Sequence, residues 1–92
     1  MTTTNISFPL GQILITPNAQ ATLHPQDIFQ ALARHALSDW GDCDPEDAEL
    51  NTRSIKDGTR IFSVYHDRQQ IKFWIITEAG RHATTNLLPK DY

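Results

Sequence analysis

The side chains that could perform acid–base or metal chemistry in this 92-residue sequence are four histidines and one cysteine. The histidines are His24, His35, His66 and His82. They form no His-x-x-x-His or Glu-x-x-His pair, and Cys43 has no partner for a Cys-x-x-Cys, so the spacing predicts no metal site. Cys43 lies between Asp42 and Asp44, whose negative charges disfavour a reactive thiolate. We therefore expect neither a bound metal nor a nucleophilic cysteine.

Metal-independent cleavage of RNA is the remaining catalytic option. It needs a base, an acid and a cation beside the phosphate that develops charge. Side chains of these kinds are present: Arg34, His35, Tyr65, Arg81, Thr84 and Thr85. Helical spacing from Leu32 and Ala36 predicts that the His35 ring is partly exposed. A purely structural role, as a surface histidine and a cross-strand threonine pair, is favoured over a catalytic one. We therefore assign no catalytic residue. With four glycines and no phosphate-binding loop, the chain is not expected to bind a nucleotide cofactor.

The formal net charge of −3 conceals an uneven distribution. Residues 39–49, the acidic segment, carry six acids and no base, whereas residues 50–92 carry seven bases and four acids, a balance of +3. The acids of this segment are Asp39, Asp42, Asp44, Glu46, Asp47 and Glu49. They could form a solvated loop and helix start, because acids stabilise helix N-termini. They could also form a polyanionic surface that binds a cationic partner. Calcium-loop spacing is absent.

Two helices should stand between the first strand and the others. Residues 12–16 predict a strand, and 18–23 a short helical turn. A helix is expected to start at His24, with Pro25 at its first position, and to end at Gly41. Its predicted buried face is Ile28, Phe29, Leu32, Ala36, Leu37 and Trp40. A second helix should run from its N-cap Asp44 to residue 56 or 57, before Gly58.

Strand-forming residues dominate the last third of the sequence. Strands are predicted over residues 60–66, 71–78 and 81–88, with a tight hairpin at Ala79-Gly80. The expected fold is a single α+β domain over residues 1–92, with residues 1–7 flexible. It has a small antiparallel sheet of about four strands, two helices on one face and the order β-α-α-β-β-β. The first strand could pair with the last or the middle strand. This order resembles RelE-type toxins in topology only, and topology does not carry function.

Trp74 is the predicted contact residue of the sheet. It follows Phe73 in a strand, so the two side chains point to opposite faces, and one of them leaves the helix-covered core. An exposed aromatic on a sheet suits a partner protein or a base, unless residues 87–92 fold over it. Arg60 and Arg81 belong to the basic part of the chain and could contact acidic protein or guide RNA. With the acidic segment, these three residues are the predicted partner-binding set.

Several stretches resemble a family of short "plasmid-related" or hypothetical proteins from phages, plasmids and integrative elements of bacteria. The resemblance rests on Ala33-Arg34-His35, Asp39-Trp40-Gly41-Asp42, residues 58–65 and 72–79, and the end from Thr84-Thr85 to Tyr92. The sequence departs from the family pattern at Gly80, usually Asp, and at His82, usually Ser. The resemblance implies a setting, mobile DNA in the cytoplasm of a bacterial host, and supplies no catalytic residues.

This setting favours an inhibitor of host defence. Anti-CRISPR proteins are similar in size and build, and commonly block effector surfaces that bind target DNA. Those surfaces are rich in Lys and Arg, so the acidic segment could occupy one of them. We therefore expect a non-enzymatic, anti-CRISPR-type protein that binds a bacterial nucleoprotein complex. It would contact the CRISPR effector subunits of that complex and could also contact its guide RNA. No small-molecule substrate is expected, and no membrane contact, because the longest apolar run, residues 73–76, has only four residues. The alternative is a RelE-like RNA-cleaving toxin or a decayed relative; a third is an accessory of plasmid transfer.

Overall fold

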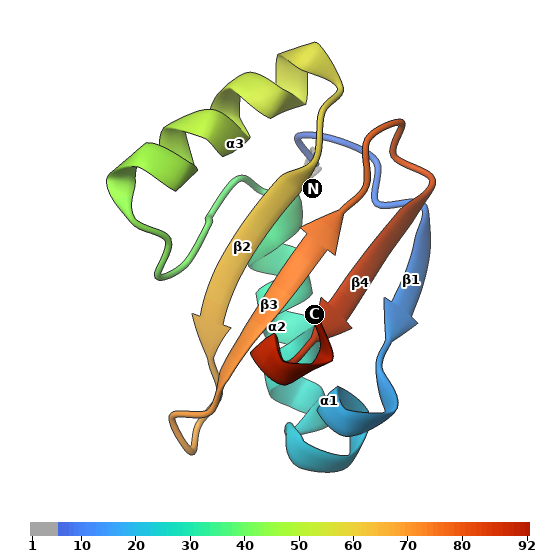
Figure 1. Cartoon of the computed structure of the whole chain (residues 1–92), viewed down its shortest axis with the longest axis vertical. Helices are drawn as coiled ribbons and strands as arrows, with labels where there is room; N and C mark the ends of the chain where they lie inside the picture. The colour runs from blue at the N-terminus through green and yellow to red at the C-terminus, as the bar shows by residue number, and fades with distance from the viewer. Residues whose placement is uncertain (1–5) are drawn as a thin grey trace, which may run out of the picture.

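A four-stranded sheet in the order β1-β4-β3-β2 is the centre of the fold, and Figure 1 shows its helices around it. The computed structural model describes residues 6–92. The elements are β1 (Gln12–Ile15), α1 (Pro17–Thr22), α2 (Pro25–Ala36), α3 (Pro45–Asp57), β2 (Ile61–His66), β3 (Lys72–Thr77), β4 (Ala83–Leu87) and the 3₁₀ helix η1 (Pro89–Asp91). The α+β class and the predicted order are confirmed.

β1 lies at an edge beside β4, the last strand, which is one of the two pairings that the sequence left open. The pair is parallel, with Gln12 opposite Ala83 and Ile15 opposite Asn86, whereas β2–β3 and β3–β4 are antiparallel. The sheet is therefore mixed and not wholly antiparallel. The reason is connectivity: α2 carries the chain back along the sheet, so β2 starts at the same end as β1, and β4 follows two reversals later (Figure 1).

Helix α2 covers one face of the sheet, behind it in Figure 1. It starts as predicted, with His24 as the N-cap and Pro25 at the first position, but it ends at Ala36 instead of reaching Gly41, because Ser38 adopts a left-handed φ of 67°. Its buried residues include Ile28, Ala31 and His35 at spacings of three and four. They pack on alternate residues of the strands, among them Tyr65, Phe73 and Ile75.

The predicted inner face of α2 was wrong in three places. Phe29 is 77% exposed and Leu37 is 46% exposed, whereas His35, predicted to be partly exposed, is fully buried. The helix is rotated so that the histidine points at the sheet. A buried imidazole is tolerated where both ring nitrogens have partners, and Ser63 and Thr77 supply them.

Helix α3 runs along the outer edge of β2 instead of lying with α2 on the sheet face. Its predicted ends are confirmed. The Asp44 carboxylate accepts the Asp47 N–H at 3.0 Å, and Gly58 at the C-cap takes a φ of 77°, a left-handed value that suits glycine. The inward side of α3 packs on a second apolar cluster around Trp40 and Ile61.

The opposite face of the sheet, in front in Figure 1, carries η1 and the C-terminus. β3 and β4 form the predicted antiparallel hairpin, but the two-residue turn expected at Ala79-Gly80 is wrong: residues 78–82 form a longer loop, in which Gly80 and Arg81 both adopt left-handed φ values. Of the segment 1–7 that we expected to be flexible, residues 1–5 lie outside the described residues, and the Ser7 N–H donates to the Ala36 carbonyl at 2.7 Å. Among residues 6–92, no helix is long and apolar enough to cross a membrane.

Candidate functional site

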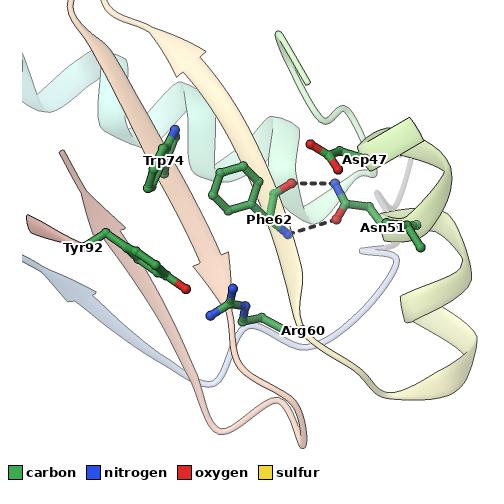
Figure 2. A pocket seen from close by; sticks show the side chains of 7 residues that line it. Asp47, Asn51, Arg60, Phe62, Trp74 and Tyr92 are labelled. Carbon is green, nitrogen blue, oxygen red and sulfur yellow. Dashed lines mark hydrogen bonds between the residues drawn. The ribbon is translucent and has the colours of Figure 1, made fainter. Parts of the chain in front are cut away.

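An open groove of about 370 Å³ lies between α3 and the front face of the sheet (Figure 2). Three elements and the C-terminal residue line it. The lining residues are Asp47, Leu50 and Asn51 of α3, Arg60 and Phe62 of the β2 region, Trp74 of β3, and Tyr92. Three of the predicted partner-binding residues, Asp47, Arg60 and Trp74, thus meet in one place although they come from separate elements.

The floor of the groove is aromatic. The Trp74 ring packs edge-on against Phe62, with centroids 4.9 Å apart, and against Tyr92, at 5.7 Å. The two outcomes weighed for Trp74, exposure to a partner and coverage by the tail, both hold in part: Tyr92 contacts the ring, and Trp74 remains half-buried. The floor therefore offers a ring surface of fixed orientation that is still open to solvent.

Opposite charges stand on the walls. The guanidinium carbon of Arg60 lies 5.6 Å from the centre of the Tyr92 ring. On the α3 wall, the exposed Asp47 side chain belongs to the first turn of the helix, where the helix dipole favours an anion. A cationic side chain from a partner could lie on Trp74 and pair with Asp47, and an anionic group could reach Arg60.

Asn51 fixes the position of α3 beside the strand. Its side-chain amide donates to the Phe62 carbonyl at 2.6 Å and accepts the Phe62 N–H at 3.0 Å, as the dashed lines in Figure 2 show. These are the two bonds that a neighbouring strand would make, so one side chain occupies the open edge of β2 at this point. The α3 wall is consequently tied to the strand that carries Phe62.

All six carboxylates of the acidic segment are exposed. Three of them have basic partners: Asp39 with Arg34 at 2.8 Å, Asp42 with His66 at 2.7 Å, and Glu49 with Arg53 at 3.0 Å. The hydrogen bond from the Arg34 guanidinium lowers the pKa of Asp39. Within residues 6–92, no base lies within 4.0 Å of Asp44, Glu46 or Asp47, which are close together at the start of α3.

Arg81 lies apart from the groove and has structural partners. Its guanidinium donates to the carbonyls of Ser54 at 2.5 Å and Thr59 at 2.6 Å, and so satisfies backbone groups around the C-terminal end of α3. It also lies over the Phe8 ring, 5.6 Å from its centre. These contacts give Arg81 a structural role, and no binding partner is needed to account for its presence.

The side chains considered for RNA cleavage do not form an open site. His35 and Thr84 are fully buried, and Tyr65 is 1% exposed. Burial, aided by the charge of Arg81, lowers the pKa of His35 to about 3, and burial raises the pKa of Tyr65. The Tyr65 hydroxyl donates to the Asp39 carbonyl at 2.6 Å. These groups hold α2 and its following loop on the sheet.

Cys43 also has a place in the packing. Its thiol donates to the Phe62 carbonyl at 3.2 Å, and burial raises its pKa, with Asp47 and Asp44 acting in the same direction. Within residues 6–92 no cluster of three or more histidine, cysteine or acidic side chains could hold a metal ion.

Sequence reasoning missed the contributions of Asn51 and Phe62 to the groove, whereas the contact of the tail with Trp74, which Tyr92 makes, was one of its two expected outcomes. Phe62 pairs with Ile76 across the strands and lies on the face of Trp74, so strand alternation contained a usable signal for it. Asn51 gave none, since a polar residue on a helix is usually solvated. In comparisons with known proteins, the chain matches no protein-family model, no curated protein and no solved structure.

Proposed function

We propose that this protein is a non-enzymatic inhibitor from a phage or mobile element. It binds a bacterial nucleoprotein defence complex, a CRISPR effector in the most specific form of the proposal, and blocks its access to target nucleic acid in the host cytoplasm. The observation that carries the proposal is the exposure of all six carboxylates of the acidic segment, three of which, Asp44, Glu46 and Asp47, have no base within 4.0 Å among the described residues.

The acidic segment suits a surface that normally binds phosphates. Such surfaces are lined with Lys and Arg, because every phosphate carries a negative charge. The exposed carboxylates at the start of α3 offer those side chains an alternative partner. Complementary charge raises the association rate and fixes the orientation of the complex more than it raises affinity.

The groove adds a contact that is specific and not only electrostatic. An Arg side chain of the partner that lies on the half-buried Trp74 ring and pairs with Asp47 combines a cation–π contact with an ion pair. Contacts of the first kind contribute on the order of 0.5–2 kcal/mol. Arg60, on the other wall, disfavours a second cation and suits guide RNA or an acidic side chain.

The plating efficiency of a phage on a host with CRISPR immunity against it tests this proposal. Expression of the protein should raise the plaque number toward that on a host without the CRISPR system. The Glu46→Lys/Asp47→Lys variant should lose this effect. Asp57→Lys/Glu78→Lys, which makes the same change of charge outside the acidic segment, should retain it. An unchanged plaque number with the wild type would contradict the proposal.

RNA cleavage of the RelE type is the alternative, and the burial of His35 and Thr84 counts against it. Incubation of the purified protein with labelled RNA should leave the RNA intact. Cleavage that is lost in His35→Ala or Arg81→Ala would support the toxin and refute the binding proposal. Expression of the protein alone should leave bacterial growth unchanged.

A further inference from the structure

The two edge strands of the sheet, β2 and β1, differ in how their outward-facing backbone groups are covered. At the β2 edge, α3 runs alongside the strand and Asn51 bonds both backbone groups of Phe62. At the other edge, all four residues of β1 are exposed, and the strand, Gln12–Ile15, has no charged residue and no proline. Proteins usually protect an open edge with such residues or with a covering element. Within the part of the chain that the structure describes, β1 is therefore an unprotected edge strand.

The unbonded backbone groups of β1 can be assigned. The Gln12 N–H donates to the His82 carbonyl at 3.0 Å, and the Thr16 N–H donates to the Asn86 carbonyl at 3.0 Å. Alternate residues of a strand direct their backbone groups to the same side, so Gln12, Leu14 and Thr16 bond toward β4. Ile13 and Ile15 consequently present their N–H and C=O groups to the open edge.

The side chains of β1 are apolar and accessible. Ile13 is 42% exposed, and Leu14 and Ile15 are each 40% exposed. Ile13 and Ile15 border a groove of about 410 Å³ between β1 and α2, beside Phe29, which is 77% exposed. The groove has no charged lining residue; it is formed by Ile13, Ile15, Gln20, Leu23, Pro25, Ile28, Phe29 and Leu32.

We propose that a second copy of this chain covers this edge, by antiparallel pairing of the two β1 strands about a twofold axis at Leu14. Ile13 then stands opposite Ile15 of the second copy, and each of these two pairs exchanges two backbone hydrogen bonds. The two Leu14 residues form the non-hydrogen-bonded pair, in which side chains approach most closely. Ile13, Ile15 and Phe29 of both copies meet on the α2 face.

Symmetry favours a second copy as the occupant. The outward-facing residues Ile13 and Ile15 lie one on each side of Leu14 and are of the same type, so the edge is complementary to itself. A twofold contact of this kind closes after two copies, because it uses the open β1 edge of the sheet that residues 6–92 form. The result is one continuous sheet of eight strands.

The distribution of charge also favours a second copy of the chain at the β1 edge. The β1 edge and its groove are uncharged, so two copies meet without burying a charge. The acidic segment lies beyond β2, at the far edge of the sheet. With strands about 4.8 Å apart, the acidic segments of two paired copies are separated by roughly 30 Å or more. This exceeds three Debye lengths of about 8 Å at physiological salt, so their repulsion is largely screened.

The measurement is sedimentation equilibrium of the purified chain over a range of concentrations. One four-residue strand and a shallow groove form a contact below the usual size of about 800 Å² per partner, so we expect dissociation at micromolar concentrations. The mass should rise with concentration from the 10.5 kDa of the monomer toward twice that value. Leu14→Lys places two like charges at the axis and should keep the mass at 10.5 kDa. Leu50→Lys, at an exposed leucine of α3, should dimerise as the wild type does.

Amide hydrogen exchange identifies the paired strand independently of any substitution. The Gln12 and Leu14 amides should be protected at all concentrations, whereas the Ile13 and Ile15 amides should become protected only as the dimer forms. A constant monomer mass, a dimer that Leu14→Lys leaves intact, or a dimer in which Ile13 and Ile15 exchange freely would each overturn the proposal. The result is independent of the proposed inhibition, which the plaque assay tests.

Discussion

His35 donates its Nε2–H to the hydroxyl of Thr77 across 2.8 Å in the buried layer between α2 and the sheet. The donor in this bond can be identified because it belongs to a series of connected hydrogen bonds that ends at the Leu10 carbonyl. The Leu10 carbonyl can only accept, so the Thr84 hydroxyl donates to it at 2.6 Å, and the Thr77 hydroxyl therefore donates to Thr84 at 2.8 Å. Thr77 must then accept from the imidazole. Ser63 completes the series by donating to Nδ1 at 2.6 Å.

The first prediction concerns pH, because this series of hydrogen bonds needs a neutral imidazole. The pKa of His35 is lowered by burial from 6.5 to about 3. Between these values the unfolded chain binds a proton that the folded chain does not. Stability is therefore complete above pH 6.5 and falls as the pH approaches 3. The free energy of unfolding should drop by about 2–3 kcal/mol between pH 7 and 4.5 from this group alone.

Urea unfolding of the wild type and of His35→Gln at both pH values isolates that contribution. The variant lacks the titrating group but keeps an amide that can donate and accept. It should lose about 2 kcal/mol less than the wild type on acidification, whatever its stability at pH 7. If acidification lowered the free energy of unfolding equally in the two proteins, the folded chain would not keep His35 neutral.

The second prediction compares neighbouring threonines of β4. Thr84→Val removes the hydroxyl that joins Thr77 to the Leu10 carbonyl and leaves both without this partner in the core. We expect a loss of about 1–3 kcal/mol in the free energy of unfolding. Thr85→Val, on the opposite face and half-buried, should change it by less than about 0.5 kcal/mol. If the two substitutions changed the free energy of unfolding in urea by similar amounts, the hydrogen bonds of Thr84 to Thr77 and Leu10 would not stabilise the fold as proposed.

The third prediction concerns the protected β2 edge. Asn51→Leu keeps the approximate size of the side chain but leaves the Phe62 N–H and carbonyl without their amide partner. It should cost about 2–3 kcal/mol in urea unfolding and increase light scattering at high concentration, since an open strand edge pairs with other chains. Leu50→Ala, at the adjacent exposed residue, is the control and should do neither. A stable, non-aggregating Asn51→Leu protein would show that α3 covers the edge without this contact.

The fourth prediction separates two arginines that the sequence grouped together. Arg81→Ala removes the donors to the Ser54 and Thr59 carbonyls and should lower the midpoint of thermal unfolding by several degrees. Arg60→Ala should leave the midpoint within about a degree or two, because this exposed side chain contacts mainly the Tyr92 ring. The opposite order of the two midpoints would contradict the assignment of Arg81 to the fold and of Arg60 to the groove.

Local signals accounted for most of the correct sequence predictions. Pro25, Asp44 and Gly58 act within one turn of a helix end, so the helix starts and the end of α3 could be predicted from neighbouring residues. The burial of His35 could not, because its partners Ser63 and Thr77 are 28 and 42 residues away in sequence. The predicted inner face of α2 consisted of apolar residues alone, and it therefore included the exposed Phe29 instead of His35.

In the candidate site, too, local features could be predicted from the sequence, whereas contacts between distant residues could not. The charge of the acidic segment and the alternation around Trp74 could be read directly from the sequence. That Asp47 and Trp74 share a groove depends on α3 lying along the β2 edge, which Asn51 secures through Phe62. The structural use of Arg81 likewise depends on its reach to the end of α3, a contact between residues 27 positions apart.

Inhibition of a CRISPR effector can be measured directly as an electrophoretic mobility shift of labelled target DNA with a purified effector complex, in the presence of this protein. The wild type should prevent the shift of the DNA, Glu46→Lys/Asp47→Lys should not, and Asp57→Lys/Glu78→Lys should. An effector that binds its DNA equally well with and without the wild-type protein, or inhibition that survives in Glu46→Lys/Asp47→Lys, would contradict the proposed function.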